Sequence, residues 1–314
     1  MSAVVIGIHG LGNKPPRVVL ENWWREAIQE GFGRIGESKT SFKFEMVYWA
    51  DVLHSTPLQM QASGEDSSAV LLEPYFPIPY TKHPEASKLR RRILDYIEKQ
   101  IDRLYLRDDL TIDLSRISDR IIHRFFQDLE VYYSQTVRWE NNEERFVRDI
   151  IRNRLYKVLK KYKNHDILLL AHSMGSIISY DVLTGQAKDI DIDTFITIGS
   201  PLGIPVIMDK IALEGKFDIK NGKKLAAPDN IISHWYNFSD LHDRVAFNYN
   251  LADDYQASSR NVLPVDTIVF NDYEIEKQRN PHKSYGYLRS PELSRVVFDF
   301  LATNESKLSL WLRK

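Results

Sequence analysis

Ser173 stands where a strand pattern changes into a helix pattern. Residues 167–171 are apolar throughout, and residues 174–187 read as an apolar helix. Ala171 and Gly175 flank the serine, with Ala171 at a position where this small-x-Ser-x-small pattern usually has glycine. Such a turn holds the serine in a strained conformation that exposes its hydroxyl, and small flanks let strand and helix approach. The pattern predicts that Ser173 is a nucleophile for acyl transfer.

A serine nucleophile of this kind needs a histidine base later in the chain, with an acid between the two. Most of the nine histidines precede or abut Ser173, which leaves His234, His242 and His282. His234 falls inside a predicted strand. His282 lies in a loop before the last predicted helix, at the edge where the carboxyl ends of parallel strands collect. We predict His282 as the base, although chain order alone does not exclude His242.

Two aspartates, Asp240 and Asp243, are candidates for the acid between nucleophile and base. Both lie in the loop that follows a predicted strand at 231–238. Asp243 is followed by x-Val245-Ala246, which resembles the Asp-x-Val turn by which many hydrolases of this type present their acid. We prefer Asp243, and Asp240 stays open as the alternative.

A glycine-rich turn, His9-Gly10-Leu11-Gly12, follows the first predicted strand at 4–8. Backbone N–H groups of such a turn can stabilise the oxyanion of a tetrahedral intermediate. We predict the amides of Leu11 and Met174 as this pair, with His9, Gly10 and His172 beside them in the site. The turn lacks the spacing of a phosphate-binding loop, and the two prolines after Lys14 remove two donors.

The predicted elements alternate between strands and helices. The strands are nearly continuous apolar runs, as expected when both faces of a sheet are covered. Asn142 and Ser290 are the expected caps of the third and last helices. The fold class we expect is α/β, with a mostly parallel, doubly wound sheet of about six strands. The predicted strands are 4–8, 44–49, 167–171, 194–198, 231–238 and 265–270, and the predicted helices are 17–31, 143–163, 174–187 and 291–303.

Residues 50–142 interrupt this alternation without a convincing buried strand. They contain a proline-punctuated segment and two amphipathic patterns, one over 89–104 and one over 117–132. We predict a helical cap or lid inserted into a core formed by 1–49 and 143–314. The basic run at 88–92 leaves a transient contact with a membrane surface as an alternative to a solvated helix face.

Taken together, the His9-Gly10 turn, the Ser173 elbow, the late aspartate and the final histidine resemble an α/β-hydrolase, specifically a lipase or serine esterase. Two stretches, 172–183 and 236–246, are also similar to the DDHD-type intracellular phospholipases. The chain departs from that type at Arg244, where proline is frequent, and in having fewer than eight strands. The resemblance implies a functional role for Asp181. The alternative is a packed carboxylate, which needs no catalytic role.

Composition limits the other function classes. Lys plus Arg number 42 and Asp plus Glu 43, a net charge of -1 that gives no reason to expect nucleic acid. The chain has no cysteine, which excludes a thiol nucleophile and cysteine-held metals. We expect no metal and no organic cofactor. We also expect no transmembrane helix, since no apolar run reaches about 18 residues, and therefore a cytoplasmic location. The oligomeric state stays open.

These residues predict a serine hydrolase of carboxylic esters. His282 would take the proton of Ser173, Asp243 would orient His282, and water would release the acyl group. An aromatic-rich insertion favours a lipid ester over a small polar one. The open alternatives are a thioesterase, an amidase or an acyltransferase on the same fold, and a catalytically silent binding module.

Overall fold

The computed structural model describes residues 2–38, 41–58, 74–80, 120–139, 142–215, 224–246 and 248–311. A six-stranded sheet with the order β10-β8-β6-β5-β1-β2 runs through its centre, and all five pairings are parallel. The expected α/β class with a mostly parallel sheet is confirmed. The strands are β1 (Ala3–Ile8), β2 (Phe44–Val47), β5 (Asp166–His172), β6 (Ile192–Ile198), β8 (Ile231–Ser239) and β10 (Pro264–Ile268).

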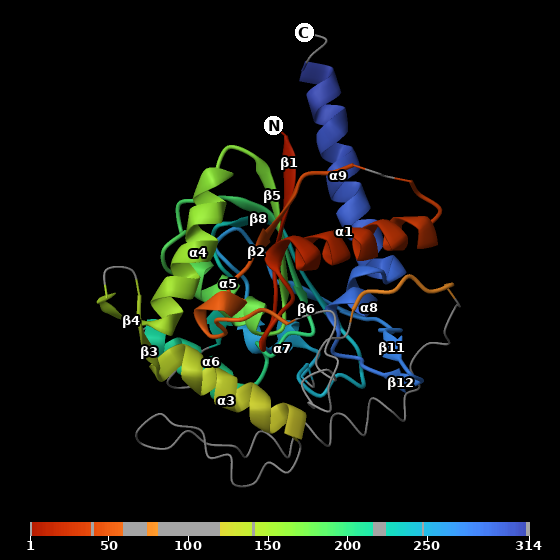
Figure 1. The fold of residues 1–314 in the computed structure, drawn as a ribbon. Helices are drawn as coiled ribbons and strands as arrows, with labels where there is room; N and C mark the ends of the chain where they lie inside the picture. The colour runs from red at the N-terminus through yellow and green to blue at the C-terminus, as the bar shows by residue number, and fades with distance from the viewer. Residues whose placement is uncertain are drawn as a thin grey trace.

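Helices cover both faces of this sheet (Figure 1). One face carries α4 (Val147–Lys161), α5 (Met174–Thr184) and α6 (Pro205–Gly215). The other carries α1 (Arg17–Arg34), α8 (Ser284–Leu288) and α9 (Pro291–Trp311).

Successive strand residues alternate between the two hydrophobic clusters that these helices complete. Leu169 and Ala171 pack into the cluster with α4 and α5, whereas Leu168 and Leu170 pack into the cluster with α1 and α9. Both faces of β5 are therefore buried, which is why its sequence is continuously apolar instead of alternating.

The strand order places a topological switch point between β1 and β5. From β1 the chain goes to β2 on one side and later returns to β5 on the other. Ile8 pairs with Ala171, so the turn that begins at His9 and the elbow at Ser173 leave the sheet side by side. The carboxyl ends of parallel strands beside a switch point form the usual ligand-binding crevice of such sheets.

The helix α3 and several short elements complete the described chain. Among its residues, no helix combines the length and the apolar character needed to cross a membrane. These elements are η1 (Ala50–Val52), α3 (Arg120–Ser134), β3 (Thr136–Arg138), β4 (Glu144–Phe146), β7 (Leu225–Ala226), α7 (Leu251–Asp254), β9 (Tyr255–Gln256), β11 (Glu274–Ile275) and β12 (Gln278–Arg279).

The start of the third predicted helix was wrong. Residues 144–146 form β4, which pairs with β3 in an antiparallel hairpin, so α4 begins only at Val147 with Phe146 as its cap. Asn142 does not cap this helix, because it lies in the hairpin turn with φ 62°. Ser290 precedes α9 as expected, but its hydroxyl donates to the carbonyl of Tyr287 (2.8 Å).

Only parts of the predicted lid, 50–142, fall within the described residues. The predicted helix over 89–104 and the basic run at 88–92 lie outside them, and the division into core and lid stays a prediction. The second amphipathic pattern coincides with α3, whose Leu129 and Tyr132 are buried in the cluster beside α4 and α5.

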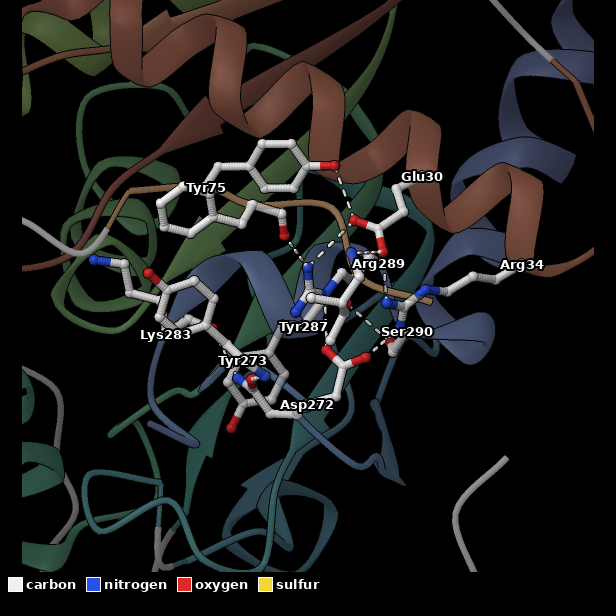
Figure 2. Close-up of polar contacts among 12 residues, drawn as sticks. Glu30, Arg34, Tyr75, Asp272, Tyr273, Lys283, Tyr287, Arg289 and Ser290 are labelled. Atoms are coloured by element: carbon white, nitrogen blue, oxygen red, sulfur yellow. Dashed lines mark hydrogen bonds and ion pairs between the residues drawn. The ribbon is translucent and has the colours of Figure 1, made fainter. Parts of the chain in front are cut away.

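Residues 74–80 are held to the core by a buried ionic network (Figure 2). Arg289, with a side chain only 1% exposed, binds Asp272 (2.7 Å) and Glu30 (3.3 Å) and donates to the carbonyl of Phe76 (2.7 Å). Arg34 binds the same two carboxylates, each at 2.6 Å. Two cations therefore pair with two anions in a site largely closed to water. Removing any one of them would leave a buried charge without its full set of partners.

We expect Arg289→Ala to lower the free energy of unfolding by about 3–5 kcal/mol, because Asp272 and Glu30 lose a buried partner. Arg295→Ala is the control, since the Arg295–Glu37 pair is exposed (49% and 37%) and a pair of that kind contributes at most about 1 kcal/mol. Urea denaturation measures both. Equal losses in the two variants would contradict this account of the network.

Asp254 is the last residue of α7, and the pKa of its carboxyl group is shifted in the folded protein. Burial raises its pKa to about 6, and the nearby Asp253 and Asp266 act in the same direction, while a bond from Asn248 opposes them. A carboxyl whose pKa is higher in the folded than in the unfolded chain binds more protons when folded. Stability is therefore lost as the pH rises from about 4 to about 6.

We expect Asp254→Asn to melt at a higher temperature than the wild type above pH 6, with the difference disappearing near pH 4. Asp229 offers a control of opposite sign, because the bond from the Ser259 amide lowers the pKa of its carboxyl. Asp229→Asn is expected to destabilise the protein at neutral pH. Melting curves across this pH range test the pair, and a stabilisation by D254N that persists at pH 4 contradicts the titration.

Candidate active site

Ser173 occupies a strained turn between β5 and α5. Its backbone has φ 53° and ψ -125°, outside the regions that non-glycine residues normally adopt. Its N–H donates to the carbonyl of Ile198 (3.0 Å), which ties the turn to the neighbouring strand β6. A Cβ on Gly175 would lie 2.7 Å from the carbonyl oxygen of Ile8, so only glycine lets α5 start this close to β1. Glycine at position 175, two residues after the serine, is therefore required sterically.

Three side chains predicted from separate parts of the sequence meet at this turn. The Nε2 atom of His282 lies 3.0 Å from the Oγ of Ser173. The Nδ1 atom of His282 lies 2.8 Å from Oδ2 and 2.9 Å from Oδ1 of Asp243. Oδ1 of Asp243 also accepts the N–H groups of Val245 (2.9 Å) and Ala246 (3.3 Å), so the residues after the aspartate fix its carboxylate. A continuous hydrogen-bonded chain connects serine, imidazole and carboxylate.

The alternative acid and bases lie apart from this chain. Asp240 is buried, and its carboxylate pairs with Arg279 and accepts the N–H of Asn271 (2.7 Å). His242 contacts Asp240 (3.2 Å) and Arg279 (3.1 Å). His234 is exposed near the start of β8 and stacks on Tyr236. Asp240 and His242 therefore belong to a separate cluster around Arg279.

His9 fixes the orientation of the peptide between Gly10 and Leu11. The N–H of Trp49 donates to Nε2 of His9 (3.0 Å), so Nε2 is an acceptor and Nδ1 carries the ring proton. That proton is donated to the carbonyl of Gly10 (2.8 Å). In a trans peptide the N–H points opposite to the carbonyl, so the amide of Leu11 points away from the His9 ring. Burial, with the charge of Lys14, lowers the pKa of His9 well below its usual range.

Gly10 and Met174 complete the backbone around the serine. A Cβ on Gly10 would lie 2.7 Å from the Cβ of Ser173, so the turn after β1 is packed directly against the elbow. Met174 is the first residue of α5, and the N–H groups of a first helical turn have no partner within their own helix. The turn after β1 and the start of α5 thus both adjoin Ser173, and the pairing of the Leu11 and Met174 amides as oxyanion donors stays a prediction.

His172 supports the segment that carries His282. Its Nε2 lies 2.8 Å from the carbonyl oxygen of His282, which can only accept, so Nε2 carries a proton. Burial, followed by the charge of His282, lowers the pKa of His172 well below its usual range. A neutral ring with its proton on Nε2 satisfies both observations.

Asn271 is a site residue that the sequence did not reveal. It is fully buried, and its side-chain Nδ2 donates to the carbonyls of Pro281 (2.8 Å) and Lys283 (2.7 Å). Together with His172, it binds the carbonyls of three consecutive residues centred on His282. No motif surrounds Asn271, since it is one polar residue in the loop after β10.

Tyr287 is the second residue that the sequence did not reveal. Its hydroxyl lies 2.7 Å from Oδ2 of Asp243. The carboxylate thus contacts a phenol as well as the imidazole.

Asp181, which the family resemblance implied, does not join the site. Its carboxylate accepts bonds from Arg152 (2.7 Å) and Tyr132 (3.0 Å), and these contacts connect α5 to α4 and α3. Burial raises the pKa of Asp181, with Arg152 opposing the shift. Its role here is to fasten α3 to the core.

The arrangement supplies a hydroxyl, a base that can take its proton, an acid that orients the base, and backbone amides nearby. Among the described residues, no group of three or more histidines and carboxylates is placed to hold a metal ion. The hydroxyl, the base and the acid can transfer a proton and form a covalent bond through Ser173.

Two comparisons with known proteins bear on this site. A family model described as "PGAP1-like alpha/beta domain" matches residues 109–283, more than half of the chain. That range includes Ser173, Asp243 and His282. A protein named as a probable mitochondrial phospholipase of Schizosaccharomyces pombe is 33% identical over 87 residues, which cover 24% of this chain and 10% of that protein. The chain therefore spans about a tenth of the length of this relative.

The hydrogen bonds of the two buried histidines predict their protonation states. Between pH 8 and pH 5 we expect His9 to stay neutral with its proton on Nδ1, and His172 to stay neutral with its proton on Nε2. Nitrogen-15 NMR of the imidazole rings distinguishes these states, with the exposed His234 ring as a solvated reference. Protonation of either buried ring above pH 5, or the opposite tautomer, contradicts the assignment.

Proposed function

The chain belongs to the PGAP1-like alpha/beta domain family, an α/β-hydrolase-type lipase family, and on this premise we propose that it hydrolyses carboxylic esters of lipids with Ser173 as nucleophile. The observation that carries the proposal is the unbroken chain from the Oγ of Ser173 through His282 to the buried Asp243. The likeness to the probable phospholipase supports a lipid substrate.

In the first step, Nε2 of His282 takes the proton of Ser173 while Oγ attacks the ester carbonyl carbon. The carbonyl oxygen becomes an oxyanion, which the amides of Leu11 and Met174 stabilise. The intermediate collapses, the protonated His282 gives its proton to the departing alkoxide, and an acyl-serine remains. Asp243 stays ionised throughout and stabilises the imidazolium.

In the second step, a water molecule takes the place of the alcohol. Nε2 of His282 removes one proton from the water as its oxygen attacks the acyl-serine. The second tetrahedral intermediate then collapses: the bond from carbon to Oγ breaks, the protonated His282 gives its proton to Oγ of Ser173, and the carboxylic acid is released. Each amide donor of the oxyanion site is expected to lower the barrier by about 3–4 kcal/mol.

Labelling with a fluorophosphonate tests the nucleophile directly. We expect the wild type to form a covalent adduct and Ser173→Ala to form none. Ser176→Ala is the matched control, because Ser176 lies in the first turn of α5, three residues after Ser173. Its buried hydroxyl donates to the carbonyl of Ala171 (3.4 Å). Asp243→Asn is expected to slow ester hydrolysis by about 10⁴-fold.

Equal labelling of wild type and S173A would remove Ser173 from the mechanism. An unlabelled wild type that folds normally would favour the silent binding module instead. A panel of p-nitrophenyl esters of graded chain length, with matched thioesters and amides, then identifies the acyl chain and the leaving group. Faster turnover of the thioester or the amide would replace the ester assignment.

A further inference from the structure

Tyr287 connects two aspartates beside the base. It lies in α8, directly after the loop that carries His282, and its side chain is fully buried. The N–H of Asp240 lies 2.9 Å from its hydroxyl oxygen, and Oδ2 of Asp243 lies 2.7 Å away. An amide can only donate, so the hydroxyl accepts from Asp240 and its single proton goes to Asp243.

This proton gives the Asp243 carboxylate a donor besides the imidazole. Oδ2 receives both the Tyr287 hydroxyl and Nδ1 of His282, while Oδ1 receives the N–H groups of Val245 and Ala246. Hydrogen bonds to an ionised acceptor are strong, and they spread its charge over the donors. A carboxylate that shares its charge with a phenol stabilises an adjacent imidazolium less than one that faces the imidazole alone.

We propose that Tyr287 is a positioning residue that holds Asp243 against His282 and, by sharing the charge of this carboxylate, keeps His282 available as a base at lower pH. The proposal rests on the proposed function, in which His282 must be neutral to accept the proton of Ser173. Tyr287 acts through Asp243 and does not itself contact the nucleophile.

The other groups around the base do not replace this effect. From β5, the neutral His172 ring lies 4.9 Å from the His282 ring. From the loop after β8, Asp240 is paired with Arg279, which also contacts His242. Two further charges lie near this site: Lys14 in the turn after β1 and Lys283 beside the base, both of which act on His172.

Replacing Tyr287 with phenylalanine removes one oxygen and leaves all of these groups in place. The aromatic ring keeps its packing in the cluster beneath α1 and α9. The amide of Asp240 loses its acceptor, and Asp243 loses one donor. A shift in the pH midpoint of labelling then reports on the Asp243 carboxylate. A general loosening of the site would instead change the labelling rate without moving this midpoint.

The pH dependence of fluorophosphonate labelling measures this titration without a known substrate. The rate of labelling falls at low pH as His282 becomes protonated, which defines an acid limb. We expect Tyr287→Phe to move the midpoint of this limb upward by about half to one pH unit. Tyr180→Phe is the matched control, since Tyr180 is equally buried and donates to the carbonyl of Ala226 (2.7 Å), and its limb should stay at the wild-type position.

A second substitution tests the same bond without removing it. Site-specific fluorotyrosine at position 287 has a more acidic phenol and donates more strongly, so the acid limb should move to lower pH. This variant also keeps the experiment informative if Tyr287→Phe does not fold, which thermal unfolding checks.

The outcomes separate the two proposals. If the wild type is not labelled, the proposed function fails. If the wild type is labelled with a clear acid limb, but the limb of Y287F coincides with it or moves to lower pH, the role of Tyr287 is overturned. The same holds if the fluorotyrosine limb does not move downward.

Discussion

The pairing of β1 with β5 is the contact on which the candidate site depends. Ile8 of β1 lies beside Ala171 of β5, and β2 occupies the far side of β1. The glycine turn and the serine elbow therefore leave the sheet together, at its switch point. Backbone hydrogen bonds between two central strands, each buried after its first residue, set the distance between the turn and the elbow. The sheet therefore holds the nucleophile and the amides around it rigidly in place.

The base is held in a different way. His282 lies in a segment that forms neither strand nor helix, and side chains supply the bonds that fix it. Asn271 and His172 bind the carbonyls around it, and Tyr287 and Asp243 are joined beside its ring. One half of the site is thus placed by the sheet and the other by a network of side chains.

This division explains how much of the molecule could be predicted. The strands were predictable because continuous apolar runs report burial on both faces. The elbow pattern, the order of the residues along the chain and the Asp-x-Val turn together selected three side chains that the structure brings together. Asn271 and Tyr287 were not predictable, because their partners are distant or backbone groups and their residue types are common. The cap at Asn142 was predicted wrongly, since the hairpin formed by β3 and β4 places Asn142 in its turn instead of at the start of the helix. The helix expected over 89–104 lies outside the described residues.

At Ser173, the backbone angles that expose the nucleophile also lower the stability of the fold. A non-glycine residue at φ 53° and ψ -125° costs the fold about 1–3 kcal/mol, and glycine would adopt the same angles with little strain. Selection for a durable scaffold alone would therefore drive this codon toward glycine. A chain with serine at position 173 is less stable than the same chain with glycine there. If the protein lost its catalytic function, we would therefore expect mutation to replace this serine early.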